Sequence, residues 1–218
     1  MGRVGWRPWS RKAFNGASNF YASSNDRDTF GSCSGLLRHW RIRPLSKEGQ
    51  EIMAFTIPEG LHPDLNPLAW LVGTWRGKGR GEYEGIEPFQ FAHEIVFSHD
   101  GRPFLNYYSR SWLIDDDDEI IRPAASETGF WRVRPGNTLE VLIAHNTGIA
   151  EGWVGRFDGP KIQLVMDQGY SAPTAKIVTE GSRLYGLVEG ELFFAYDMAA
   201  EGKLMQPHLW STLPRSHD

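Results

Sequence analysis

The stretch Phe89-Gln90-Phe91-Ala92-His93-Glu94-Ile95-Val96-Phe97-Ser98 decides the class of fold. Its odd-numbered residues are Phe, Phe, His, Ile and Phe, whereas the even-numbered ones are Gln, Ala, Glu, Val and Ser. Successive side chains of a β-strand point to opposite faces, so a strand made of these residues has one strongly apolar face. The stretch therefore predicts a half-buried strand.

Short runs of the same strand-like kind recur along the chain at the spacing typical of barrels and sandwiches. Glycine-containing turns, such as Asp100-Gly101, Glu180-Gly181 and Glu189-Gly190, separate them. The runs cover residues 73–85, 104–113, 129–133, 139–144, 152–157, 162–166, 175–179, 182–187 and 192–198. Before them, Asn66 as N-cap, Pro67 at the first position and Gly73 beyond the end predict one short helix.

About ten such strands in succession predict an all-β fold, an antiparallel up-and-down β-barrel preceded by a short helix. Closure is the simplest arrangement because it removes exposed strand edges. A barrel slightly larger than eight strands leaves room for one small ligand inside. An open sandwich is the alternative.

Composition limits the classes of partner. The net charge is −4, with +5 in residues 1–52 and −9 in the remainder, so the folded part is not expected to bind nucleic acid or an anionic membrane. The lone Cys33 excludes an intrachain disulfide and fits a reducing compartment. No apolar run approaches the roughly 20 residues of a membrane span, and we expect a cytoplasmic protein.

Residues 1–52 form a basic segment without periodicity. Three interpretations compete for it. Met53 is a second plausible start, which would make the segment non-native; its Arg and Ser content also suits a transit peptide; and it could be a disordered arm. In each case the ligand-binding part is expected to be residues 61–215.

The segment Gly73-Thr74-Trp75-Arg76-Gly77-Lys78-Gly79-Arg80-Gly81 places its glycines on one face of a strand. A face without side chains predicts close approach by another backbone or by a flat ligand. A phosphate-binding loop is not indicated, since the spacing differs and no strand–helix unit follows.

Motifs in order along the chain resemble the nitrobindins, haem-binding proteins whose barrel is like that of fatty-acid-binding proteins. The resemblance covers residues 61–215. It lies in Gly73-x-Trp75-x-Gly77-x-Gly79 with Tyr83 and Ile86-Glu87-Pro88-Phe89, Phe97-Ser98-His99-x-Gly101-x-Pro103-Phe104-Leu105, Glu127-Thr128-Gly129-Phe130-Trp131-Arg132, Ala144-His145-x-Thr147-Gly148, Ala172-Pro173-Thr174-Ala175-Lys176 and Leu204-x-Gln206-Pro207-His208-Leu209.

The resemblance implies one haem b per chain, with His208 as its axial iron ligand and catalytic residue. It places Lys176 near the haem edge and assigns Thr74 and Trp75 to the signature strand near the haem. It also implies a ferric protein that isomerises peroxynitrite to nitrate and binds nitric oxide. A homodimer is a separate possibility. Where many nitrobindins carry a second, distal histidine, this chain has Ala125.

Seven histidines compete for a ligand role when the residues alone are considered. We expect His93, on the apolar face of its strand, to be a core histidine more often than a ligand, and His62 and His99 to be solvated; His39 and His217 fall in terminal segments. His208 lies among apolar residues after Pro207, and a ligand role there requires an acceptor, usually a backbone carbonyl, for its second ring nitrogen.

The remaining features have simpler interpretations. The acidic run 115–119 lacks the glycine and the late glutamate of a calcium loop and indicates a solvated hairpin loop. Tyr107 and Tyr108 are left without an assigned role. The alternative function is a carrier of a small apolar ligand without catalysis, in which an inward-pointing Arg132 would pair with a carboxylate.

Overall fold

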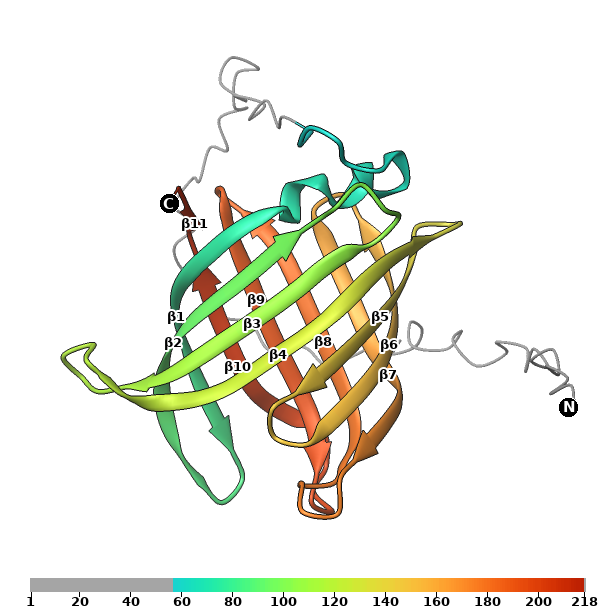
Figure 1. The fold of residues 1–218 in the computed structure, drawn as a ribbon. Helices are drawn as coiled ribbons and strands as arrows, with labels where there is room; N and C mark the ends of the chain where they lie inside the picture. Colours follow the sequence, from blue (N-terminus) through green and yellow to red (C-terminus); the bar gives the residue numbers. More distant parts are fainter. Residues whose placement is uncertain (1–56, 218) are drawn as a thin grey trace, which may run out of the picture. The chain divides into compact units, whose positions relative to one another are not determined.

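The computed structural model describes residues 57–217. The predictions made for residues 1–52 lie outside this range. Within it, one short helix precedes a ring of strands (Figure 1). The elements are the 3-10 helix η1 (Pro63–Leu71) and strands β1 (Gly73–Tyr83), β2 (Ile86–Ser98), β3 (Leu105–Ile114), β4 (Ile120–Arg134), β5 (Thr138–His145), β6 (Ile149–Asp158), β7 (Lys161–Ser171), β8 (Val178–Val188), β9 (Glu191–Ala200), β10 (Gln206–Leu213) and β11 (Arg215–Ser216).

The sheet closes into the predicted barrel. Each strand from β1 to β9 pairs antiparallel with the next one in sequence, and β10 pairs with β1, for example Gly81 with Leu209. The two-residue β11 also lies against β1. The all-β, roughly ten-stranded up-and-down barrel predicted from the sequence is therefore confirmed.

The up-and-down order gives the barrel two distinct ends. The helix η1 and the turns after β2, β4, β6 and β8 share one end, which we call the helix end; the turns after β1, β3, β5, β7 and β9 share the far end (Figure 1). η1 buries Leu65, Leu68 and Leu71 and covers the barrel mouth. No helix in the described residues is long and apolar enough to cross a membrane.

The short helix is real, but it begins earlier than predicted. His62, not Asn66, is its N-cap, and the ring Nδ1 of His62 accepts a hydrogen bond from the Asp64 N–H at 3.2 Å. Pro63 fills the first position and Pro67 lies inside. The segment is a 3-10 helix in which Asn66 is an interior residue and Pro67 has no N–H to donate.

Two strand predictions need correction. Residues 175–177 belong to a loop, and 178–188 form one strand, so Glu180-Gly181 is not a turn. A β-carbon on Gly181 would lie 2.7 Å from the Trp153 ring, so this glycine makes room for an indole inside the barrel. Conversely β10 was not among the predicted runs, since Pro207 and irregular alternation obscured it.

The glycine-rich strand is confirmed as a place of close approach. Gly77, Gly79 and Gly81 share the inward face of β1 with Trp75 and Tyr83. A β-carbon on Gly77 would overlap the carbonyl oxygen of Thr212 on β10, and one on Gly81 would overlap a phenylalanine ring of β2. The glycines therefore let β10 approach β1 closely and close the barrel.

Replacing Gly79 with valine is expected to destabilise the protein by about 1–3 kcal/mol, because even a β-carbon would lie 2.5 Å from both Phe91 Cζ and the Trp210 carbonyl oxygen. Urea unfolding of the haem-free protein measures the effect. The matched control is Gly152→Val on β6, where the nearest atom to an added β-carbon is 3.8 Å away. Equal losses in the two variants would contradict the close-approach explanation.

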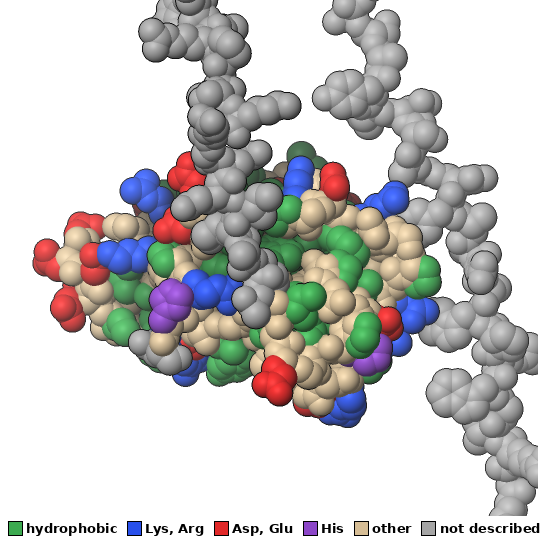
Figure 2. Space-filling view, turned by 90° about the horizontal axis from the view of Figure 1, so that it is seen from above, with side chains coloured by type: hydrophobic (Ala, Val, Ile, Leu, Met, Phe, Trp, Pro, Cys, Tyr) green, Lys and Arg blue, Asp and Glu red, His purple; other side chains and the backbone are tan. Residues whose placement is uncertain are grey.

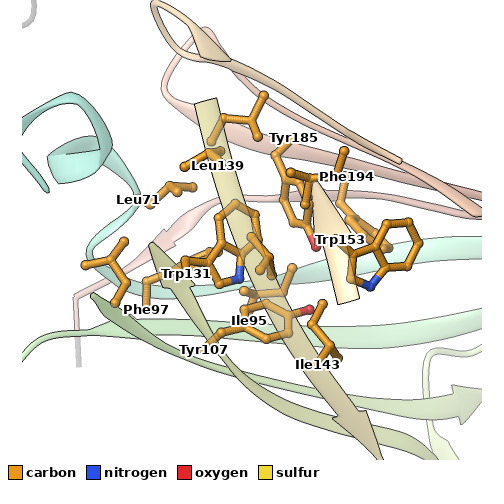
Figure 3. Close-up of a cluster of buried hydrophobic side chains, with 14 of the residues drawn as sticks. Leu71, Ile95, Phe97, Tyr107, Trp131, Leu139, Ile143, Trp153, Tyr185 and Phe194 are labelled. Carbon is orange, nitrogen blue, oxygen red and sulfur yellow. The ribbon is translucent and has the colours of Figure 1, made fainter. Parts of the chain in front are cut away.

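The helix-end half of the barrel is filled by an aromatic cluster centred on Trp131 (Figure 3). Ring centroids of Phe97, Tyr107 and Tyr185 lie 5.2, 5.9 and 5.0 Å from that of the fully buried Trp131. Seen onto the helix end, hydrophobic side chains gather near the centre with charged ones around them (Figure 2). Aromatic packing therefore fills this half of the interior.

Candidate functional site

His208 lies near the far end of the barrel, on the strand that closes it. Pro207 pairs with Asp197 and Leu209 pairs with Tyr196, so His208 is the extra residue of a β-bulge between them. Bulges re-aim side chains and are frequent beside functional sites. Here the bulge turns the His208 ring toward Tyr83 and Tyr196, whose ring centroids lie 5.5 and 5.9 Å away in edge-on geometry.

The His208 imidazole has one nitrogen engaged and one available. Its Nδ1 lies 3.1 Å from the carbonyl oxygen of Glu82 on β1, which can only accept a hydrogen bond, so Nδ1 carries the proton. Within the described residues, Nε2 has no hydrogen-bond partner. This is the backbone acceptor that the sequence could not reveal, and it orients the ring as in protein metal sites.

The electrostatic surroundings keep this imidazole neutral. Burial lowers the pKa of His208 to about 4, the hydrogen bond to the Glu82 carbonyl works in the opposite direction, and the nearby Lys176 ammonium lowers the pKa further. The ring is half-buried by exposed area, which is enough for partial desolvation. At neutral pH the Nε2 lone pair is therefore free to bind a metal.

Lys176 lies at the same end of the barrel, in the loop between β7 and β8. Its Nζ lies 3.6 Å from Sδ of the buried Met198, so the side chain folds inward over the rim. Desolvation lowers the pKa of Lys176, while Glu151 and Glu201 raise it. The structure thus brings together Lys176 and His208, as predicted from the resemblance.

Thr74 and Trp75 lie elsewhere. Trp75 is fully buried near the helix end, donates its indole N–H to the Leu71 carbonyl at 2.8 Å and lies under the Arg215 guanidinium at 4.1 Å. Thr74 pairs with Val96 and Ser216 at that end. Since each strand residue advances about 3.3 Å, Trp75 is roughly 23 Å along β1 from Glu82. The structure therefore does not bring either residue to His208.

A buried charged layer, formed by Glu127, His145, Glu151 and Arg183, lies between the aromatic cluster and the far end. Arg183 donates two hydrogen bonds to the Glu127 carboxylate, at 2.8 and 2.9 Å, and its side chain is fully buried. His145 Nε2 lies 2.9 Å from Glu151 Oε2. Arg183 and the neighbouring charges lower the pKa of Glu127 to about 2, although its burial acts to raise it.

The charged layer adjoins His208 through one aromatic residue. The Arg183 guanidinium lies 4.7 Å from the centroid of the Tyr196 ring. The Tyr196 ring in turn contacts the ring of His208. Sequence reasoning missed this layer as a unit. Glu127 and His145 do stand in the quoted motifs. Glu127 lies two residues before the inward-pointing Gly129, and His145 lies two residues after the inward-pointing Ile143. Strand alternation would therefore have placed both side chains inside the barrel.

The other histidines are mostly structural. His93 is buried, with its two ring nitrogens 2.8 and 2.9 Å from the hydroxyls of Ser211 and Ser109, which confirms a core histidine. His62 caps η1 and His217 is exposed. The prediction that His99 is solvated is wrong, since it is half-buried and its Nδ1 is buried without a partner among the described residues. His39 lies outside those residues.

The buried His93 should make the protein less stable in acid. Burial lowers its pKa from 6.5 to about 4, so between these pH values the unfolded chain binds a proton that the folded one does not. The free energy of unfolding is therefore expected to decrease by roughly 3 kcal/mol as the pH falls from 6.5 toward 4. Urea unfolding at pH 7 and pH 4 should show that His93→Gln loses less stability between these pH values than the wild-type protein does. Equal losses in the two proteins would contradict the role assigned to His93.

Three other predicted positions are also settled. Arg132 points outward and pairs with Glu140 at 3.5 Å, so the inward Arg132 of the carrier hypothesis is wrong; the inward arginine is Arg183. The run 115–119 is the β3–β4 hairpin loop, in which the Asp115 carboxylate accepts two backbone N–H bonds. Ala125, on β4, hydrogen-bonds through its backbone with the Ser111 hydroxyl.

Comparison with known proteins identifies the family. Residues 64–215 match the model of the THAP4-like, heme-binding beta-barrel domain. The chain belongs to this haem-binding family. A peroxynitrite isomerase from Nocardioides sp. is 51% identical over 75% of this chain and 99% of its own length. A ferric nitrobindin-like protein from Cutibacterium acnes is 39% identical over 75% of this chain and 100% of its own.

A solved structure agrees with the family assignment. The crystal structure of Rv2717c from M. tuberculosis matches with a TM-score of 0.65 and 38% identity, over 72% of this chain and 99% of that one. The nitrobindin resemblance and the haem cofactor predicted from the sequence motifs are thus confirmed.

The residues at the far end fit a haem. A neutral imidazole offers a free Nε2 for iron, with its other nitrogen held by a backbone carbonyl. Tyr83 and Tyr196 provide aromatic surface beside it, and the inward-folded Lys176 supplies a cation suited to a propionate. These residues would hold an iron porphyrin through a single protein nitrogen, that of His208.

Proposed function

We propose that this chain is a ferric haem b protein that isomerises peroxynitrite to nitrate, with His208 as the axial ligand. The observation that carries the proposal is the His208 ring itself, neutral, oriented by the Glu82 carbonyl and with Nε2 unpaired. Its family and the peroxynitrite isomerases at up to 51% identity support the same conclusion.

Each residue has a distinct role in this proposal. His208 binds the metal, the β-bulge and the Glu82 carbonyl fix its ring plane, and Tyr83 and Tyr196 exclude water from its flanks. Lys176 holds a propionate at the rim. When bound, haem would supply the chemistry that rearranges peroxynitrite to nitrate, a change in which the O–O bond is exchanged for a third N–O bond, while the residues above would hold and orient it.

The proposal is tested with the purified full chain in two steps. Titration with haemin is expected to give a saturable one-to-one change in the Soret band, whereas a lipid carrier without haem would give none. Stopped-flow mixing of the loaded protein with peroxynitrite should then show decay faster than for the haem-free protein, with nitrate as the product. Saturable haemin binding without faster peroxynitrite decay would contradict the isomerase activity but not haem binding.

Two finer features belong to the same proposal. Nitric oxide should bind at the same coordination position and shift the Soret band of the loaded protein. A homodimer is the second, supported by the exposed Phe130, Leu142 and Tyr170 on the outer wall, and sedimentation of the purified protein tests it. A single monomeric species at all concentrations would exclude the dimer.

A further inference from the structure

We propose that His145 is a positioning residue that carries two ring protons and so neutralises the buried charged layer, allowing an anion to enter the far half of the barrel. This inference rests on the proposed function, because the anion is the substrate of that site. It concerns four residues, Glu127, His145, Glu151 and Arg183, to which the proposed mechanism has so far given no role.

The contacts of the two ring nitrogens point to a doubly protonated ring. His145 Nε2 is hydrogen-bonded to Glu151 Oε2 at 2.9 Å, and Nδ1 lies within ion-pair distance of Glu127 Oε1, at 3.4 Å. An ionised carboxylate can only accept hydrogen bonds, so each nitrogen that faces one is best satisfied as an N–H donor. A neutral ring would direct one nitrogen lone pair at a carboxylate oxygen.

The count of charges leads to the same state. Two carboxylates face one guanidinium, and the side chains of Glu151 and Arg183 are 1% and 0% exposed. An uncompensated negative charge buried at this depth is costly. With a protonated His145 the layer sums to zero; with a neutral His145 it carries one net negative charge.

The remaining titratable groups around the layer do not supply that charge. Tyr107, which donates to Glu127, and Tyr185 have their pKa raised by burial and stay neutral. Burial lowers the pKa of His93 to about 4, so it is neutral as well. Tyr196 is neutral with a raised pKa. Lys176, at the rim, faces both Glu151 and Glu201, and counting the Lys176 and Glu201 charges together leaves the sum for the layer unchanged.

The position of the layer links it to the ligand site. In the ring of ten strands, β5 lies across the barrel from β10, and His145 and His208 both lie toward the far end of their strands. Arg183 contacts the same Tyr196 ring that flanks His208. A net charge in the layer therefore acts on any anion bound beside His208, because charges interact more strongly through protein than through bulk water.

The first test needs no haem. In ¹⁵N-histidine-labelled haem-free protein at pH 8, which lies above the ordinary pKa of histidine, the imidazole nitrogen shifts are expected to show one ring that is still doubly protonated. His145→Gln should remove that signal. If every ring of the wild-type protein is neutral at pH 8, the proposal is wrong, whether or not the protein binds haem.

The second test uses the haem-loaded protein and two ligands, azide for the ferric form and carbon monoxide for the ferrous form. His145→Gln is expected to weaken azide binding by about tenfold, the effect of one unit charge at a separation of about 10 Å and an effective dielectric constant of about 20. Binding of the uncharged carbon monoxide should stay within about twofold.

Two further variants separate charge from packing. Adding Glu151→Gln to His145→Gln makes the layer neutral again and should restore azide affinity, which a purely structural role of His145 would not do. Arg132→Gln removes one positive charge from the outer wall and should leave azide affinity unchanged. Equal weakening of azide and carbon monoxide, or no recovery in the double variant, would overturn the proposal.

Discussion

His208→Ala is expected to lower haem affinity by more than about 100-fold and to change the Soret spectrum of whatever haem remains bound. Loss of an outer-shell partner of a metal ligand typically costs 10- to 100-fold, and this substitution removes the ligand itself. In the described residues no second free imidazole lies beside it, because His93 and His145 have both ring nitrogens facing other side chains.

Haemin titration with absorbance detection measures this effect. His62→Ala is the matched control, since His62 caps η1 at the opposite end of the barrel and should retain wild-type affinity. Added imidazole should restore a wild-type-like spectrum to His208→Ala by occupying the vacated space. An unchanged affinity and spectrum in His208→Ala would show that another residue ligates the iron.

Arg183→Met is expected to destabilise the haem-free protein by about 3–5 kcal/mol, which is the typical cost of removing one partner from a buried ion pair. The Arg183 side chain is fully buried and donates two hydrogen bonds to Glu127, so its loss leaves the two buried carboxylates of the layer without their guanidinium partner. Without the guanidinium, the pKa of Glu127 should also rise from its present value of about 2.

Urea unfolding at pH 7 measures the loss for Arg183→Met. Arg132→Met provides the control, because the exposed Arg132–Glu140 pair should contribute no more than about 1 kcal/mol. Adding Glu127→Gln to Arg183→Met should recover part of the stability if unpaired charge is the cause. A loss below about 1 kcal/mol in Arg183→Met would mean that the charged layer does not stabilise the fold.

Period-two alternation was enough to predict the barrel, because one face of each strand is buried and the other meets water. The same rule failed at residues 175–181, where Gly181 looked like a turn residue but accommodates the Trp153 ring. A glycine that makes room for a side chain from another strand cannot be distinguished from a turn glycine in the local sequence.

The candidate site was predictable only in part, and for a similar reason. The family motif identified His208 and Lys176, which the structure brings to one end. Trp75 belongs to the signature motif on β1, but it lies near the start of that strand, at the opposite end of the barrel from His208. Arg183 was missed because no local pattern distinguishes a buried arginine; its partners Glu127 and Glu151 come from 56 and 32 residues away.

The β-bulge that presents His208 lies on the last long strand, and the carbonyl that orients its ring belongs to the first, 126 residues earlier. During synthesis, the nitrogen intended for iron thus emerges from the ribosome after nearly all the other strands, and it is aligned only when β10 joins β1. Truncated or misregistered chains would then lack the oriented ligand. An oriented haem ligand in this architecture therefore requires the first and last long strands to have paired in the correct register.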